Sequence, residues 1–170
     1  MKLTEFFLAE LDREAAPTRR VVAEVPALEG HFDWKPHEKS MGFGYLANLV
    51  ASMPSWITMM IRQDSLDLNP PGGSGYNPPQ AHDGAGLAEL LDGHVAAARE
   101  ALEQTTDEHL MTSWRLLVAG NVVLEQLRHV AIQDAFNHLA HHRGQLTVYL
   151  RLNGAKVPSV YGPSADDKVF

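Results

Sequence analysis

The residues best suited to chemistry are three histidines within five positions, His138, His141 and His142, in a chain with nine histidines among its 170 residues. His138 and His142 are four residues apart, so on a helix they project from one face, one turn apart. Two imidazoles in this arrangement can share one divalent cation, as in metalloenzymes with an H-x-x-x-H motif. The spacing alone leaves open a second interpretation, in which the pair is a polar seam along the helix. His141 falls on a neighbouring stripe, which indicates a hydrogen-bonding or surface residue.

The remaining histidines are weaker candidates. They lie in or near expected loops and helix ends, where solvated or capping roles are typical: His31, His37, His82, His109 and His129, with His94 inside a helical pattern. Because of that position, a metal held elsewhere in the fold could recruit His94. Arg143 and Gln145 flank the histidine pair and either support a metal ligand or face another helix.

Several other chemistries are excluded because their sequence motifs are absent. The sequence contains no H-E-x-x-H motif and no Glu three residues before a His, so zincin and ferritin-like sites are not expected. It has no P-loop, G-x-S-x-G or dinucleotide motif, and GGSG at 72–75 is read as a linker. There is no cysteine, which excludes disulfides, thiolate metal sites and cysteine nucleophiles. Any thiol chemistry would need a thiol supplied by a small molecule.

Composition indicates one ordinary globular domain over 1–170. Apolar residues make up 45% and charged residues 21%, and the net charge is −7. An acidic chain without a Lys/Arg cluster is a poor partner for nucleic acid. No apolar run is long enough to span a membrane, and the first residues do not resemble a signal peptide. We therefore expect a cytoplasmic protein with neither nucleic acid nor membrane as its partner.

The elements that must position the histidines are helices. Hydrophobic periodicity predicts an all-α four-helix bundle. The expected helices cover 2–25 (kinked or restarted at Pro17), 40–62 (capped by Ser40, bent at Pro54), 85–105 (capped by Asp83) and 128–153 (stopped by Gly154). A long loop, 64–83, separates the second and third helices. A small hairpin is possible around Gly120-Asn121, before the fourth helix, and 155–170 should form an irregular arm.

Two segments carry a resemblance to a known family: DWKPHEKSMGFGYLANLVASMPSW and NHLAHHRGQLTVYLRLNGAKVPSVYGPSADD. They resemble the DinB-like family of damage-inducible bacterial helical proteins. This resemblance implies an up-down-down-up bundle, often a homodimer, with a divalent metal held by three histidines. Two of these histidines come from the last helix of the family and match His138 and His142. The third comes from the second helix, and its position falls on Asn48. An amide oxygen is a weak ligand for zinc or nickel. Asn48 therefore ligates directly or through water, another residue such as His94 replaces it, or the site is vestigial.

The resemblance leaves two functions open, and whether the chain is an enzyme is not decided. Related proteins include transferases and isomerases in which a metal activates a low-molecular-weight thiol such as bacillithiol or mycothiol, and a hydrolase is also conceivable. In that case His138, His142 and Asn48 would hold the metal, while the catalytic residues, substrate and thiol stay unknown. The alternative is a non-catalytic, stress-associated dimeric binding protein with a degenerate metal site. One fold hosts many functions, so the resemblance does not choose between them.

Overall fold

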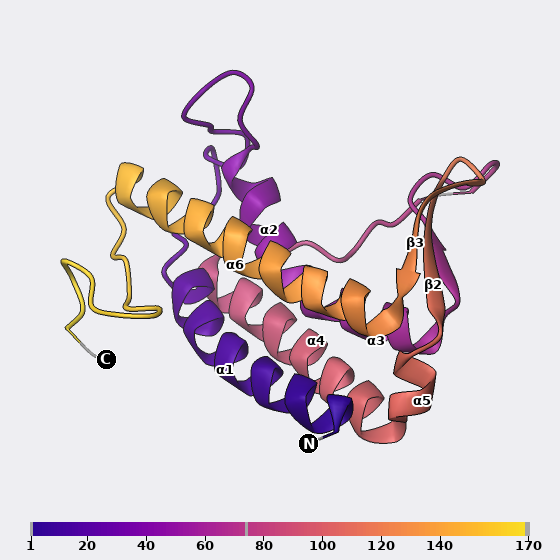
Figure 1. Ribbon diagram of the computed structural model, residues 1–170. Coiled ribbons are helices and arrows are strands. Elements are labelled where there is room, and N and C mark those ends of the chain that lie inside the picture. Colours follow the sequence, from indigo (N-terminus) through magenta and orange to yellow (C-terminus); the bar gives the residue numbers. More distant parts are fainter. Residues whose placement is uncertain (1, 74, 169–170) are drawn as a thin grey trace.

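The computed structural model describes residues 2–73 and 75–168, and within these residues it shows six helical segments and three short strands (Figure 1). In chain order the elements are α1 (Leu3–Ala23), α2 (Phe43–Ser52), α3 (Pro54–Arg62), β1 (Ser65–Asp67), α4 (Gly84–Gln104), α5 (Asp107–Leu110), β2 (Ser113–Val118), β3 (Asn121–Leu127) and α6 (Arg128–Leu152). Ser74 of the expected GGSG linker lies outside the described residues, as does the end of the expected C-terminal arm at 169–170.

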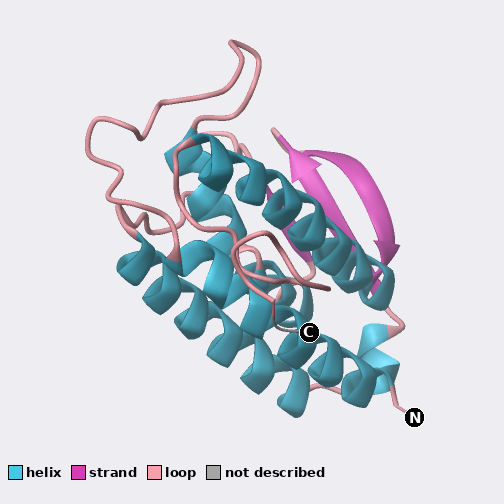
Figure 2. Ribbon diagram, turned by 90° about the vertical axis from the view of Figure 1, so that its left-hand side faces the viewer, coloured by secondary structure: helices cyan, strands magenta, loops and turns pink. Residues whose placement is uncertain are grey.

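The expectation of an all-α fold is wrong, because the chain is mostly helical but also contains a three-stranded sheet in the order β1-β2-β3. The predicted hairpin is confirmed as β2 and β3, which pair antiparallel. Strand β1 was not predicted, since it lies in the segment expected to be a loop. It pairs parallel to β2, and the Asp67 carboxylate at its end accepts hydrogen bonds from the backbone N–H groups of Ala119 and Gly120. These two residues make the hairpin turn with φ of 52° and 79°. Figure 2 shows the sheet as a separate layer beside the helices.

Two of the expected helices differ in their internal geometry. The helix expected over 40–62 is two helices, because Pro54 has no N–H to continue the hydrogen-bond ladder. The expected cap at Ser40 is wrong, since α2 begins after Gly42. By contrast, α1 is one helix through Pro17 and is not restarted there.

The ends of the other two long helices are as expected. The Asp83 carboxylate caps α4 by accepting from the N–H of Gly86 at 2.8 Å. Helix α6 stops just before Gly154, which has a φ of 74° that favours glycine.

The core consists of two buried clusters. One joins the second half of α1 to α2, to the start of α4 and to the end of α6, and contains Phe43 and Leu146. The other joins the first half of α1 to α3, to the end of α4 and to the start of α6, and contains Phe7 and Phe136. Every long helix contributes to both clusters, so α6 is held along its whole length. No helix among the described residues is long and apolar enough to cross a membrane.

Helix α6 runs antiparallel to α2 and α3. The rings of Trp56 and His138 lie 5.3 Å apart, and those of Phe43 and Tyr149 lie 6.0 Å apart. Moving forward along α6 therefore means moving backward from α3 into α2. His138 consequently faces the start of α3, and His142, one turn further along α6, lies toward α2.

Candidate functional site

The first residue of α6 is fixed by a buried arginine. Arg128 is only 1% exposed, and its guanidinium donates hydrogen bonds to the backbone oxygens of Met60 and Ser113 and to the Asp64 carboxylate. These contacts hold the start of α6 against the end of α3 and the start of β2. The sequence carries no local signal for this role of Arg128, because its partners are distant in sequence and most are backbone atoms.

The middle of α6 is fixed to α1 by a second buried arginine. Arg143 donates to the Glu14 carboxylate at 2.7 Å, to the Thr18 hydroxyl at 2.8 Å and to the Tyr161 hydroxyl. Tyr161 in turn donates to Glu14 at 2.7 Å. Of the two roles considered for Arg143, the structure shows the one in which it faces another helix. Glu14 and Tyr161 carry no local sequence signal for this contact, since they are 129 and 18 residues from Arg143.

On the other side of α6, the structure brings His138 and His142 together. Their ring centroids lie 4.6 Å apart, and their Nε2 atoms are 2.8 Å apart. His142 is buried, with 5% of its surface exposed, while His138 lies at the protein surface. The prediction that one helix face carries both imidazoles is thus confirmed, and the two Nε2 atoms converge on a single point.

A chain of hydrogen bonds orients this pair. The Oε1 atom of Gln145 lies 2.7 Å from Nδ1 of His142, and its Nε2 atom lies 3.0 Å from Nε2 of His141. An amide oxygen can only accept, so His142 carries its proton on Nδ1 and leaves Nε2 free to accept from His138. Gln145 therefore orients His142 rather than facing another helix. His141 is exposed and hydrogen-bonded, in line with its expected surface role.

Both imidazoles of the pair are biased toward the neutral form. Burial lowers the pKa of His138, and the neighbouring charges of His142 and His141 lower it further. Burial also lowers the pKa of His142, although the hydrogen bond to Gln145 acts in the opposite direction. Because only a neutral imidazole can bind a metal, this environment keeps both side chains ready for ligation near neutral pH.

Asn48, the expected third ligand, has other partners. Its amide nitrogen donates to the backbone oxygens of Gly44 and Ala81, both at 2.9 Å, and its Oδ1 accepts from the N–H of Ala81 at 2.7 Å. The side chain is buried and ties α2 to the loop that precedes α4. The structure therefore gives Asn48 a complete structural role that does not involve the histidine pair.

His94, the expected substitute, also has a partner of its own. Its Nδ1 atom lies 3.2 Å from the backbone oxygen of Ala51, in the contact between α4 and α2. Across residues 2–73 and 75–168, no group of three or more His, Asp or Glu side chains is arranged to hold a metal ion. The histidine pair is therefore a two-donor arrangement.

The pair nevertheless fits two positions of a metal coordination sphere. In a tetrahedral zinc site with Zn–N bonds of about 2.0–2.1 Å, two ligand nitrogens are about 3.3 Å apart. The Nε2 atoms at 2.8 Å need to separate only slightly, and His138 must transfer its proton from Nε2 to Nδ1. Such a site leaves at least two positions for water or for a small-molecule ligand, which is typical of an exchangeable metal rather than of a structural zinc.

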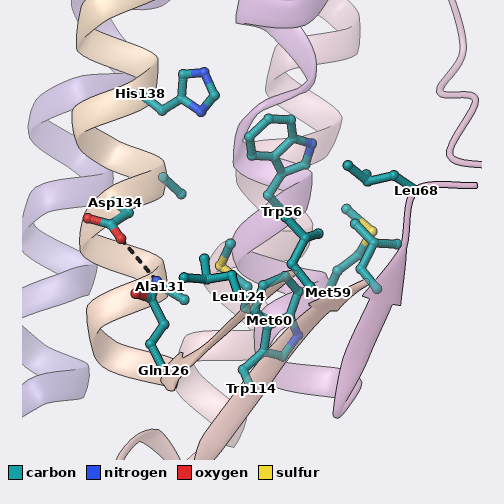
Figure 3. A pocket seen from close by; sticks show the side chains of 13 residues that line it. Trp56, Met59, Met60, Leu68, Trp114, Leu124, Gln126, Ala131, Asp134 and His138 are labelled. Atoms are coloured by element: carbon teal, nitrogen blue, oxygen red, sulfur yellow. Dashed lines mark hydrogen bonds between the residues drawn. The ribbon is translucent and has the colours of Figure 1, made fainter. Parts of the chain in front are cut away.

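An apolar cavity of about 260 Å³ opens beside His138 (Figure 3). Helices α3 and α6 and the sheet form its walls, and the ring of Trp56 lies across from His138. The contact between Trp56 and His138 had no signal in the sequence, because the two residues are far apart along the chain. The candidate site thus combines two converging imidazoles with an adjoining space large enough for a small molecule.

Solved structures with the same architecture are DinB-like proteins. One from Bacillus cereus superposes with a TM-score of 0.68 at 22% sequence identity, covering 92% of this chain and 97% of that one. Another from Bacillus subtilis gives a TM-score of 0.64 at 18% identity, covering 96% of this chain and 99% of that one. At these identities the likeness establishes the fold, which is the mostly helical DinB-like fold with a small sheet.

The family itself follows from the sequence match. The model of the DinB family matches residues 4–168, which is nearly the whole chain. The protein belongs to the DinB family. No curated protein matched the chain.

Proposed function

We propose that this DinB-family protein binds a divalent metal, zinc or nickel, through the Nε2 atoms of His138 and His142. The observation that carries the proposal is the convergence of these two atoms at 2.8 Å, with Gln145 holding the Nδ1–H of His142. When bound, such a metal supplies Lewis acidity that lowers the pKa of a coordinated thiol or water. Protons compete with a metal for the imidazole nitrogens, and this competition is weakened because the pKa values of both imidazoles are lowered.

The same proposal assigns the protein a thiol-dependent transfer reaction. The chain has no cysteine, so the thiol would be a small molecule that takes one of the open coordination positions. In this role His138 and His142 would hold the metal, Gln145 would orient His142, and the ring of Trp56 would limit the movement of His138. The long helices would form the up-down-down-up core that the family resemblance implies. The antiparallel course of α6 beside α2 and α3 supports this arrangement.

A second function is favoured by one observation, namely that Asn48 is fully used in binding the loop at Ala81. A site with only two imidazoles then binds metal too weakly for catalysis, and the protein would act as a non-catalytic, dimeric binding protein. The two functions differ in metal affinity under the same conditions, so one measurement separates them.

The test is elemental analysis and calorimetric titration with Zn²⁺ and Ni²⁺ on untagged protein, since a polyhistidine tag would bind either ion. We expect about one metal per chain, lost in both His138→Ala and His142→Ala. The matched control is His94→Ala, which removes a half-buried histidine outside the pair and should leave the stoichiometry unchanged. Wild-type protein without specific metal, or equal loss in the control, would overturn the metal site and leave the binding-protein function.

A further inference from the structure

The cavity beside His138 has walls from three parts of the chain. Helix α3 contributes Trp56 and Met60, α6 contributes Ala131 and His138, and the sheet contributes Trp114 and Leu124, among others. In Figure 3 these side chains surround an open space, with His138 and Trp56 at one end and Trp114 at the other. The sheet is thus the wall that closes a space which the helices alone would leave open.

The size of the cavity limits what it can hold. A protein cavity of about 150 Å³ lined by Leu, Ile and Phe side chains binds benzene, which has six non-hydrogen atoms. In the same proportion, a cavity of about 260 Å³ accommodates a ligand of about ten non-hydrogen atoms. This is the size of two fused six-membered rings. Longer or branched molecules would have to extend past Leu124 or Leu68, both of which are partly exposed.

The chemistry of the walls indicates an apolar body. Most of the lining is aliphatic, aromatic or thioether. The indole N–H groups of Trp56 and Trp114 are buried without a hydrogen-bond partner in the described part of the chain, so the two rings present carbon to the cavity. Two methionines, Met59 and Met60, also line the space, and their flexible thioethers adapt to flat ligands.

Among the described residues, the polar side chains that line the cavity are His138 and Asp134 on α6 and Gln126 on β3, next to α6. His138 lies at one end, and the Asp134 carboxylate accepts a hydrogen bond from Gln126 at 3.0 Å along the same side. The nearby carboxylate disfavours an anionic ligand, because no cationic side chain in the described part of the chain lines the cavity to offset the repulsion. His138 is the group best placed to meet a polar atom of a neutral molecule.

We propose that this cavity binds a small neutral molecule with a flat apolar body of about ten non-hydrogen atoms and a single polar group directed to His138. This deepens the proposed function, since it names the class of substrate that would react beside the histidine pair. Occupancy of the cavity does not itself require the metal, because the walls that hold the apolar body are distinct from His142 and Gln145.

The test uses 2-naphthol, a neutral bicyclic probe, on the full chain in the presence of a chelator. Calorimetry gives the affinity, and NMR resolves the three indole N–H signals of the chain. We expect saturable one-to-one binding that shifts the signals of Trp56 and Trp114 and leaves that of Trp34, which packs against Phe43 and Tyr149, unchanged. The anionic analogue 2-naphthoate should bind at least about tenfold more weakly.

A matched pair of variants on β3 provides the control. Leu124→Asp places a charge in the wall and should weaken 2-naphthol binding at least about tenfold. Val123→Asp places the same charge one residue away, at an exposed position that does not line the cavity, and should leave binding unchanged. Both side chains are already partly exposed, so both variants should fold. Equal effects of the two variants, or a probe that shifts no indole signal saturably, would overturn the proposal. Metal content is measured separately, so a failed metal site and an empty cavity are distinguishable.

Discussion

Two adjacent residues of α6, His142 and Arg143, are both buried but have opposite kinds of environment. Arg143 faces α1, where a carboxylate, a hydroxyl and a phenol satisfy its guanidinium. His142 faces the α2–α3 side, where its partners are Gln145 and a second imidazole. A buried charge whose two terminal nitrogens each donate two hydrogen bonds is a structural contact. The Nε2 atoms of His138 and His142 are instead hydrogen-bonded to each other beside a cavity, and they can exchange this single bond for a shared ligand.

The comparison predicts that the arginine side controls stability. Arg143→Met removes the partner of the buried Glu14 carboxylate and should lower the free energy of unfolding by about 3–5 kcal/mol. Urea denaturation followed by circular dichroism measures this change. Arg19→Met is the matched control, since it breaks an ion pair to Asp92 that is about half exposed on both sides and should cost less than about 1 kcal/mol.

The double variant Arg143→Met/Glu14→Gln tests the physical reason for that loss. Removing the unpaired carboxylate should restore part of the stability, because much of the cost comes from leaving a charge buried alone. If the double variant is as unstable as the sum of its single changes, the pair does not act as a unit. Metal binding by His138 and His142 should survive in every variant that stays folded.

The helices were predictable from the sequence, but their partners were not. The period of apolar residues located the long helices, and Asp83 and Gly154 marked two of their ends because caps are local features. Strand β1 was missed because three residues carry little periodicity and its stability comes from pairing with β2, about fifty residues later. The helix spacing of His138 and His142 was sufficient to place them together.

Asn48 could not be judged from the sequence, because its partner is in a loop. The bonds to Ala81 join residues 33 positions apart and depend on the course of the chain before α4. The same limit applies to the cavity, whose wall at Trp114 and Leu124 depends on the docking of the hairpin against α6. Local signals therefore identified the pair of imidazoles, whereas their surroundings could be known only from the fold.

A residue of α2 other than Asn48 is placed to complete the site. Met53 keeps helical dihedral angles (φ −56°, ψ −36°), so the spacing of 100° per residue continues from α2 into α3. Leu49 precedes Trp56 by seven residues and so lies within about 20° of its direction, while Asn48 lies about 80° away. Trp56 contacts His138, so Leu49 shares the helix face that is turned toward α6.

Leu49→His should therefore raise the affinity for Zn²⁺ by about tenfold or more, by adding a third imidazole. Asn48→His should not, and should lower the free energy of unfolding by about 2–3 kcal/mol through the loss of its buried hydrogen bonds to Gly44 and Ala81. Calorimetric titration and urea denaturation of both variants separate these effects. A gain of metal binding in Asn48→His alone would place the third ligand where the family pattern has it.

The last and smallest effect is a difference in pH dependence between the two sides of α6, measured without metal. Burial lowers the pKa of His138 and His142 in the folded chain below the value of about 6.5 expected when unfolded. The unfolded chain then binds more protons below that pH, so the free energy of unfolding should decrease as the pH falls from about 6.5. Burial acts to raise the pKa of Glu14, but hydrogen bonds from Tyr161 and Arg143 outweigh it and the pKa is lowered. The stability from Glu14 is therefore present above its unfolded pKa of about 4.5 and is lost as the pH falls through its folded value.

Urea denaturation at closely spaced pH values, with a chelator present, should resolve these two windows. In His138→Gln/His142→Gln, the free energy of unfolding should change less between pH 6.5 and 5, and its decrease below pH 4.5 should stay as in the wild type. In Glu14→Gln, the decrease below pH 4.5 should become smaller, and the change between pH 6.5 and 5 should stay as in the wild type. Only neutral imidazoles bind metal. The pH range over which the double histidine variant loses its pH dependence is therefore the range in which protons compete with a metal for His138 and His142. An unchanged slope between pH 6.5 and 5 in that variant would show that the two imidazoles titrate alike in the folded and unfolded chains, and the contrast between the two sides of α6 would then rest on geometry alone.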